Sequence, residues 1–156
     1  MLKILNGNPG FGVPFNEEET VKFLTTGKLN LHLGTVNEKG HPNVHPVWYY
    51  YDTGNYRIYI ETSKQSKKTN NLRNNTIVYF CIDDPNVPRG VRGEGDVKIH
   101  EDINFNIPIA EKIMIKYLGN TEHPIAQTLL NMQKGGQSVV LELFPKYYST
   151  WDLEKQ

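Results

Sequence analysis

The sequence predicts a mainly β protein, a small antiparallel barrel with helices at its periphery. Apolar and aromatic runs of strand length recur along the chain, and some are separated only by a tight turn, such as NEKG at 37–40 and DTGN at 52–55. Turns this short join antiparallel neighbours, whereas parallel strands need a long crossover connection. The pattern indicates roughly six or seven strands and three or four short helices, which suits a barrel better than a parallel sheet.

Length and charge narrow the class of protein. At 156 residues we expect a single domain over residues 1–156, with a Gly- and Pro-punctuated N-terminal arm at 1–15. The formal net charge is zero, which gives no overall attraction to nucleic acid or membrane. No run approaches the ~20 apolar residues of a membrane span, and the first residues do not resemble a signal peptide. We therefore expect a cytoplasmic protein that binds neither nucleic acid nor a membrane.

The elements follow in chain order. Asn16 and Glu19 form a capping-box pattern for a helix that ends by Gly27. The predicted strands are LNLHLGTV at 29–36, NVHPVWYYY at 43–51, YRIYIET at 56–62, TIVYFCID at 76–83, GVRGEGDVKIH at 90–100, SVVLELFP at 138–145 and, as a further candidate, YYSTWDL at 147–153. From Pro108 to Gln133 apolar residues recur three and four apart, which predicts two helices separated by GNTEH.

The aromatic strand at 43–51 carries apolar side chains on both faces. Alternation places Val44 and Pro46 on one face and His45 and Val47 on the other. Two interpretations stand side by side: a central strand between two apolar layers, or a strand with one face in the core and the other against a cofactor or a second subunit. Pro46 favours the second, because a proline belongs at a sheet edge or an irregularity.

The segment SKQSKKTNNLRNN at 63–75 is basic and has only one large apolar residue, Leu72. A solvated connecting helix is the commoner explanation of such a stretch. Ser66 immediately before Lys67 and Lys68, directly after a strand, instead favours an anion site at a helix start. The glycine-rich stretch of a Walker loop is absent.

Other residues give weaker signals. His41 and His45 share strand parity, but no carboxylate or thiolate lies at ligand spacing, so we expect no metal site. The single cysteine, Cys81, is predicted to be a buried strand residue. No nucleophile elbow is present, and the sequence identifies no catalytic residue. Aromatic residues beside basic ones leave single-stranded nucleic acid as a minor alternative ligand.

Taken together, the motifs resemble a known family. The order x-V-x-P-V-W-Y, turn, Y-I-E-T, S-K-K-x-x-N-L and a run ending C-I-D-D resembles the pyridoxamine 5'-phosphate oxidase-like split-barrel flavoproteins. The similarity extends from about Lys28 to Asp152 and is densest between Thr35 and Asp84. It implies a split β-barrel homodimer that binds FMN at the subunit interface.

The resemblance also implies cofactor-binding residues. The strand along the isoalloxazine ring corresponds to Val44, His45, Pro46 and Val47, and the pair near the ribityl phosphate corresponds to Glu61 and Thr62. The phosphate clamp corresponds to Ser66, Lys67 and Lys68, with Asn71 as a further polar contact. The part contributed by the second subunit corresponds to Arg89, Gly90 and Trp151.

Three departures from the family pattern are visible. Glu61 stands where a tyrosine is usual, and lysine at 67 replaces an arginine, which keeps the charge but loses the bidentate fork. The oxidase's C-terminal Arg-x-His motif, which binds the substrate phosphate, is absent, since the chain ends WDLEKQ. We therefore expect an FMN-dependent oxidoreductase with a different small-molecule substrate. The alternatives are a deazaflavin-dependent reductase, or a flavin- or haem-binding protein without reductase turnover.

Overall fold

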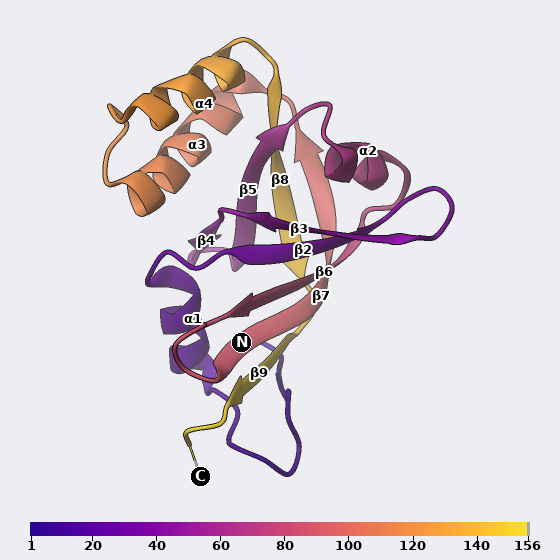
Figure 1. Ribbon diagram of the computed structural model, residues 1–156, viewed down its shortest axis with the longest axis vertical. Coiled ribbons are helices and arrows are strands. Elements are labelled where there is room, and N and C mark those ends of the chain that lie inside the picture. The colour runs from indigo at the N-terminus through magenta and orange to yellow at the C-terminus, as the bar shows by residue number, and fades with distance from the viewer. Residues whose placement is uncertain (156) are drawn as a thin grey trace.

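The computed structural model describes residues 1–155 and confirms a mainly antiparallel split barrel with peripheral helices (Figure 1). The strands are β1 Ile4–Asn6, β2 Leu31–Val36, β3 Pro42–Val47, β4 Tyr50–Asp52, β5 Arg57–Ser63, β6 Ile77–Asp83, β7 Arg89–His100, β8 Ser138–Pro145 and β9 Tyr148–Asp152. The helices are α1 Glu17–Thr25, α2 Lys67–Asn74, α3 Ile103–Leu118 and α4 Pro124–Lys134. The strands form one sheet in the order β3-β2-β6-β7-β8-β5-β4, with β9 paired to β7 and β1 to β9.

The sheet curls until its two ends approach one another, and β2 and β3 cross in front of β5 and β8 (Figure 1). The ends of the strand order are β3 and β4, which are consecutive in the chain but do not pair. The continuous strand predicted at 43–51 is therefore wrong: it breaks at Trp48 and Tyr49, where the chain leaves one edge of the sheet and enters the other.

Tyr117 of α3 stabilises this break. Its ring stacks on Trp48, with centroids 4.8 Å apart and planes 4° from parallel. Its hydroxyl accepts a hydrogen bond from the Tyr49 amide at 3.3 Å and donates one to the Leu29 carbonyl at 2.7 Å. The Tyr49 amide, which has left the hydrogen-bond ladder of the sheet, thus has a partner. Burial raises the pKa of Tyr117 to about 12, so its hydroxyl keeps the proton that it donates.

The barrel interior is filled by alternate residues of the long strands. Leu31, Leu33, Ile58 and Ile82 are fully buried, as alternation in their strands requires. The capping box of α1 is confirmed: Asn16 Oδ1 accepts from the Glu19 amide, and the Glu19 carboxylate accepts from the Asn16 amide. The predicted arm at 1–15 contains a short strand, β1, which lies parallel to β9.

Two further predictions are corrected by the structure. Helix α3 begins at Ile103, not at Pro108, because Asp102 caps it by accepting from the Asn104 amide, and Pro108 lies inside the helix. Cys81 is half-buried and lies on the outer face of β6, since the buried residues of that strand are Val78, Phe80 and Ile82.

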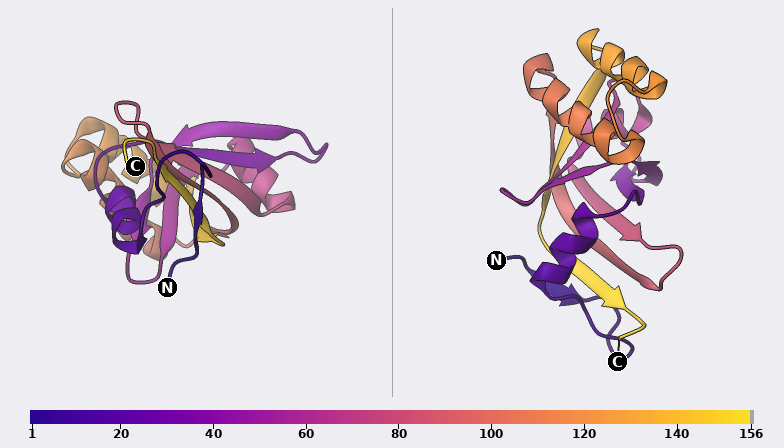
Figure 2. Two further views of the ribbon diagram at one scale, coloured as in Figure 1. Left: turned by 90° about the horizontal axis from the view of Figure 1, so that it is seen from below. Right: turned by 90° about the vertical axis from the view of Figure 1, so that its left-hand side faces the viewer.

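The paired helices α3 and α4 lie against one end of the sheet, and α2 lies at the same end on the other side of β5 and β8 (Figures 1 and 2). Among residues 1–155 no helix is long and apolar enough to cross a membrane.

Candidate functional site

The candidate site is a cavity of about 500 Å³ between the edge strand β3, strand β5 and helices α2, α3 and α4. This volume falls within the range of small-molecule sites. Its lining comprises Asn30, His45, Pro46, Val47, Trp48, Glu61, Thr62, Ser63, Lys68, Ile113, Met114, Leu129, Met132 and Ser138. The polar groups come mainly from β3, β5 and α2, whereas α3 and α4 supply aliphatic and methionine side chains. The cavity therefore offers both polar and apolar surfaces.

Lys68 is the unusual cation of the cavity. Only 8% of its surface is exposed, and within residues 1–155 it forms no ion pair. Burial lowers the pKa of its ammonium group. A lysine buried without a partner is costly, and an anionic ligand would offset that cost.

The start of α2 is tied to the end of β5, which positions Lys68. Ser66 is the N-cap residue, and its Oγ accepts from the Thr69 amide at 3.3 Å. The Thr69 hydroxyl donates to the Ser63 carbonyl at 2.9 Å. The helix enters with its first turn beside the cavity, and the positive end of its dipole favours an anion there.

His45 and Val47 point to the inner side of β3. They pair with Leu33 and Leu31, which are both buried. The positive charge of Lys68, and to a lesser degree burial, lowers the pKa of His45. His45 is therefore a neutral hydrogen-bonding group above pH 7, available to a ligand without adding charge.

Glu61 is the carboxyl group of the cavity, and its position is fixed by a chain of buried amides. Nε2 of Gln133 donates to Glu61 Oε2 at 3.1 Å, and Oε1 of Gln133 accepts from Asn106 Nδ2 at 3.0 Å. Burial raises the pKa of Glu61, and the hydrogen bond from Gln133 partly opposes this.

The structure brings together six of the residues predicted from the resemblance. His45, Pro46, Val47, Glu61, Thr62 and Lys68 line the cavity. Pro46 lies on an edge strand, as its missing amide favours, so the central-strand interpretation of residues 43–51 is wrong.

Other predicted residues of the same region lie outside the cavity lining. Val44 faces outward and is 65% exposed. Ser66 caps α2, and Asn71 donates from Nδ2 to the buried Thr35 hydroxyl at 3.0 Å. Lys67 is exposed and borders a separate polar groove with His41.

Arg89, Gly90 and Trp151 lie together, away from the cavity lining. Gly90 pairs with Trp151 across β7 and β9, and a Cβ at Gly90 would lie 2.5 Å from the indole ring. Arg89 forms an ion pair with Asp84 at 3.4 Å. Their expected approach to a cofactor bound by a second subunit stays a prediction.

Gln133 and Asn106 were missed from the sequence. Gln133 shares the buried stripe of α4 with Ala126 and Leu130, so a polar residue in an apolar stripe was the available signal. Asn106 lies in the first turn of α3, where the helix had not been predicted.

Comparison with known proteins agrees with this architecture. The family model described as pyridoxamine 5'-phosphate oxidase matches residues 17–152, so the chain belongs to that family. No curated protein sequence matches it.

Solved structures share the fold at low identity. The conserved hypothetical protein Rv2991 of Mycobacterium tuberculosis has a TM-score of 0.77 at 24% identity, over 93% of this chain and 89% of that one. An F420 reductase has a TM-score of 0.66 at 24% identity, over 88% and 98%. A pyridoxamine 5'-phosphate oxidase-related, FMN binding protein of Nostoc punctiforme has a TM-score of 0.61 at 14% identity, over 81% and 75%.

Proposed function

We propose that this protein binds a flavin-type cofactor, with FMN as the leading candidate, and uses it as an oxidoreductase on a small molecule. The observation that carries the proposal is Lys68, a buried cation without a counter-ion, in a cavity that also offers an apolar surface. Family membership and the fold shared with an FMN binding protein support it.

The residues of the cavity fit a flat ring with an anionic tail. Lys68 and the first turn of α2 would hold the anion, with the Thr62 hydroxyl beside them. Trp48 and Val47 border the apolar part, and Tyr117 holds the Trp48 ring in place by stacking. Bound flavin would supply two-electron chemistry. The chain would contribute binding, orientation and exclusion of water.

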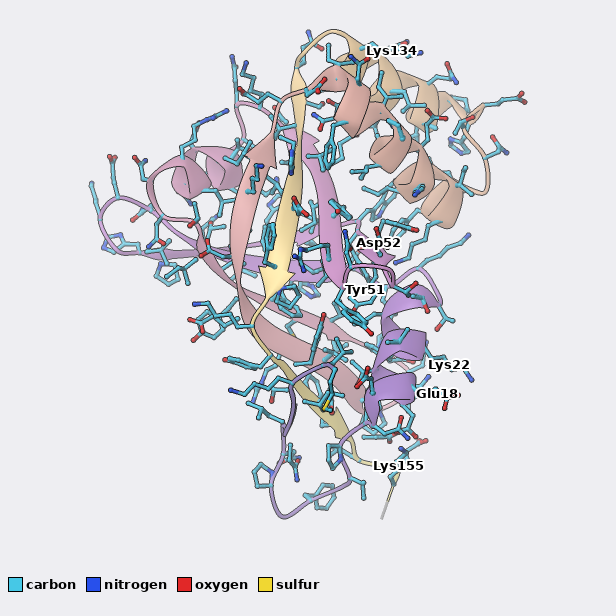
Figure 3. The ribbon with its side chains drawn as sticks, turned by 180° about the vertical axis from the view of Figure 1, so that it is seen from behind. Glu18, Lys22, Tyr51, Asp52, Lys134 and Lys155 are labelled. Carbon is cyan, nitrogen blue, oxygen red and sulfur yellow. The ribbon has the colours of Figure 1, made fainter. Side chains whose placement is uncertain are left out.

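We also propose that the substrate differs from that of pyridoxamine 5'-phosphate oxidase. The C-terminal phosphate-binding motif is missing, and Lys155 instead pairs with Glu19 beside α1. Figure 3 shows Lys155 at the end of the molecule opposite Lys134 of α4, the helix that lines the cavity. A lone cation already paired there does not replace a clamp.

We further propose a homodimer with the cofactor at the subunit interface. Paired residues share a sheet face, so the pairings of Gly34 with Val44 and with Tyr79 place these side chains in one outward row. Val44 is 65% exposed and Tyr79 58%, and Ile77 lies on the same face of β6. An apolar patch beside an edge strand favours a second copy as its cover.

Sedimentation tests the dimer. We expect a dimer at micromolar concentration, with an interface on the order of 2,000 Å² or more. Val44→Lys together with Tyr79→Lys should give a folded monomer. A parent protein that sediments as a monomer would overturn this part of the proposal.

An absorbance spectrum of purified protein tests the cofactor. Flavin bands, or a high-affinity titration with FMN, support the leading proposal, and reduction by a nicotinamide donor would add turnover. A colourless protein that binds a deazaflavin coenzyme would favour the alternative suggested by the F420 reductase fold. Bound flavin that no donor reduces, or a haem Soret band, would indicate a binding protein.

A further inference from the structure

The candidate cavity lies along the free edge of β3 as well as beside its faces. Alternate side chains of a strand point to opposite faces, yet the four consecutive residues 45–48 all line the cavity. Among residues 1–155, β3 pairs only with β2, so its other edge has no strand beside it. A cavity that meets both faces of an edge strand also meets the backbone groups along that edge.

The register of the hairpin formed by β2 and β3 shows which backbone groups face β2. The Asn37 amide donates to the His41 carbonyl at 2.9 Å. The same register continues without a bulge to the pair of Leu31 with Val47. Hydrogen-bonded pairs alternate with non-bonded pairs along an antiparallel ladder, so every second carbonyl from His41 to Val47 points toward β2. The carbonyl of Pro46 lies between two of these and points away from β2.

The free edge therefore presents an acceptor and a donor inside the cavity. The acceptor is the Pro46 carbonyl. The donor is the Trp48 N–H, which points away from β2 because it is trans to the Val47 carbonyl across their shared peptide. Within residues 1–155 this N–H has no backbone partner. Both groups belong to residues that line the cavity.

We propose that these two backbone groups recognise a ring lactam or imide, in which a ring N–H lies next to a ring C=O. The inference rests on the proposed function, because it names the part of a flavin-type ligand that the edge of β3 binds. The ligand N–H donates to the Pro46 carbonyl, and the neighbouring ligand carbonyl accepts from the Trp48 N–H. The pyrimidine end of a flavin or a deazaflavin has such a pair of groups, whereas haem has none.

Prolines keep this edge free for a ligand. A strand that added to β3 would need an N–H at every second position of the edge, and the prolines at 42 and 46 remove two of the three that β3 could direct there. The third belongs to Val44, which lies outside the cavity lining. The edge therefore suits a contact of two hydrogen bonds better than pairing with another chain.

Tyr117 is a positioning residue for the donor. Its ring stacks on the Trp48 ring, and its hydroxyl accepts from the amide of the next residue, Tyr49, at 3.3 Å. The same hydroxyl donates to the Leu29 carbonyl at 2.7 Å, close to the start of β2. These contacts hold the chain where it leaves β3, so the direction of the Trp48 N–H depends on them.

Ligands that differ by one methyl group test the recognition in the parent protein. FMN is compared with 3-methyl-FMN, in which a methyl group replaces the hydrogen of the ring N–H, and riboflavin is compared with 3-methylriboflavin. We expect each methylated ligand to bind at least about tenfold more weakly than its parent ligand, because the Pro46 carbonyl loses its donor and meets a methyl group instead. The riboflavin pair repeats the comparison without the phosphate, so the result does not depend on Lys68.

Tyr117→Phe tests the positioning role. The variant keeps an aromatic ring to stack on Trp48 but loses both hydrogen bonds of the hydroxyl. It should weaken FMN by at least about threefold and change 3-methyl-FMN less, because the methyl group already holds that ring away from the edge. Tyr50→Phe, at a tyrosine outside the cavity lining, is the matched control and should keep the parent ratio of the two affinities.

The outcomes separate the inference from the function. Equal binding of FMN and 3-methyl-FMN to the parent overturns the edge recognition while flavin binding stands, and this comparison decides even if Tyr117→Phe does not fold. A folded Tyr117→Phe with the parent ratio overturns the role of Tyr117. A parent that unfolds cooperatively but binds none of the four ligands, nor a deazaflavin coenzyme, overturns the inference and the proposed function together.

Discussion

Lys68 lies in the candidate cavity, and Lys116 lies in a second pocket beside α1. Neither lysine has a carboxylate partner within residues 1–155. Lys116 of α3 nevertheless has partners: its Nζ donates to the Tyr49 carbonyl at 3.1 Å and lies 3.5 Å from the centroid of the Tyr49 ring. Lys68 has neither kind of contact. The candidate cavity combines a cation that has no protein partner among residues 1–155 with a carboxyl group and an apolar surface, whereas the cation of the second pocket already has partners in the fold.

The difference teaches that a buried lysine indicates a ligand only when the fold leaves it without a partner. Burial lowers the pKa of both groups, to about 8 for Lys116. The pKa direction alone therefore does not distinguish them. The second pocket lies beside α1 and Tyr51, on the side of the molecule seen in Figure 3. We expect its lysine to act on stability and the lysine of the candidate cavity to act on binding.

Removal of Lys68 should have the largest effect. Lys68→Met keeps the apolar stem but removes the charge-assisted bond to an anion, worth about 1.5–3 kcal/mol, so affinity for a phosphorylated flavin should fall at least tenfold. Stability should be unchanged or higher, because no partner is lost. Fluorescence titration and chemical denaturation measure the two quantities.

The neighbouring lysine is the matched control. Lys67 is exposed and outside the cavity lining, so Lys67→Met should change affinity by less than threefold, as expected for a surface charge. Equal losses in the two variants would instead favour the paired clamp that the resemblance implies.

Gln133→Leu should have the next largest effect, on stability. The substitution preserves most of the volume but removes one of the two hydrogen bonds donated by the buried Asn106 Nδ2 and the one accepted by Glu61 Oε2, which should lower the free energy of unfolding by about 1–3 kcal/mol. Gln127→Leu, at an exposed position of the same helix, is the control for helix propensity and for the loss of an exposed side-chain hydrogen bond, since Gln127 Nε2 donates to the Thr121 carbonyl. An unchanged unfolding midpoint for Gln133→Leu would show that the amide chain contributes nothing to the fold.

Most of the fold could be predicted from the sequence because the signals for strands, turns and helix starts are local. Strand alternation, short turns and the capping box at Asn16 depend on neighbouring residues, and all reappear in the structure. The break at Trp48 depends on Tyr117, far along the chain, and the pairing of β1 with β9 joins the two ends. Such long-range contacts leave no periodic signal.

The residues of the candidate site also divide into those that a local sequence pattern predicts and those that only the tertiary fold brings together. Lys68 and Glu61 were expected from a resemblance in a contiguous segment. The apolar side chains of α3 and α4 were assigned to helices, but their approach to β3 needs the tertiary fold. One local signal distinguishes Lys68 from Lys67: on a helix, Lys68 lies four residues before Leu72, the only large apolar residue of the segment, and so shares its face. The structure separates them because Lys68 lies on the buried side of α2, with Thr69 and Leu72, and Lys67 on its exposed side.

The smallest expected effect concerns the pH dependence of stability at Lys116. The folded-state pKa is lowered to about 8 from 10.5, chiefly by burial, so the unfolded chain binds more protons between these values. The free energy of unfolding should therefore rise with pH over that window, by less than about 1.4 kcal/mol per pH unit. Lys68, whose pKa is lowered in the same direction, adds to the trend, whereas Cys81, whose pKa is raised by burial, opposes it where the thiol of the unfolded chain ionises.

Lys116→Met should flatten this rise and leave ligand affinity unchanged. Denaturation at pH 7.5, 8.5 and 9.5 measures it, and the range stops there because burial raises the pKa of Tyr117 and Tyr148, whose ionisation in the unfolded chain lowers stability at higher pH. Lys134→Met, on α4, provides a lysine control that should keep the parent slope. A parent profile that is flat, or a Lys116→Met variant that loses ligand affinity as strongly as Lys68→Met, would contradict the assignment of Lys116 to the fold. In the second case Lys116 would influence the candidate cavity, for which the contact of Lys116 with the Tyr117 ring and the stacking of Tyr117 on Trp48 provide a route.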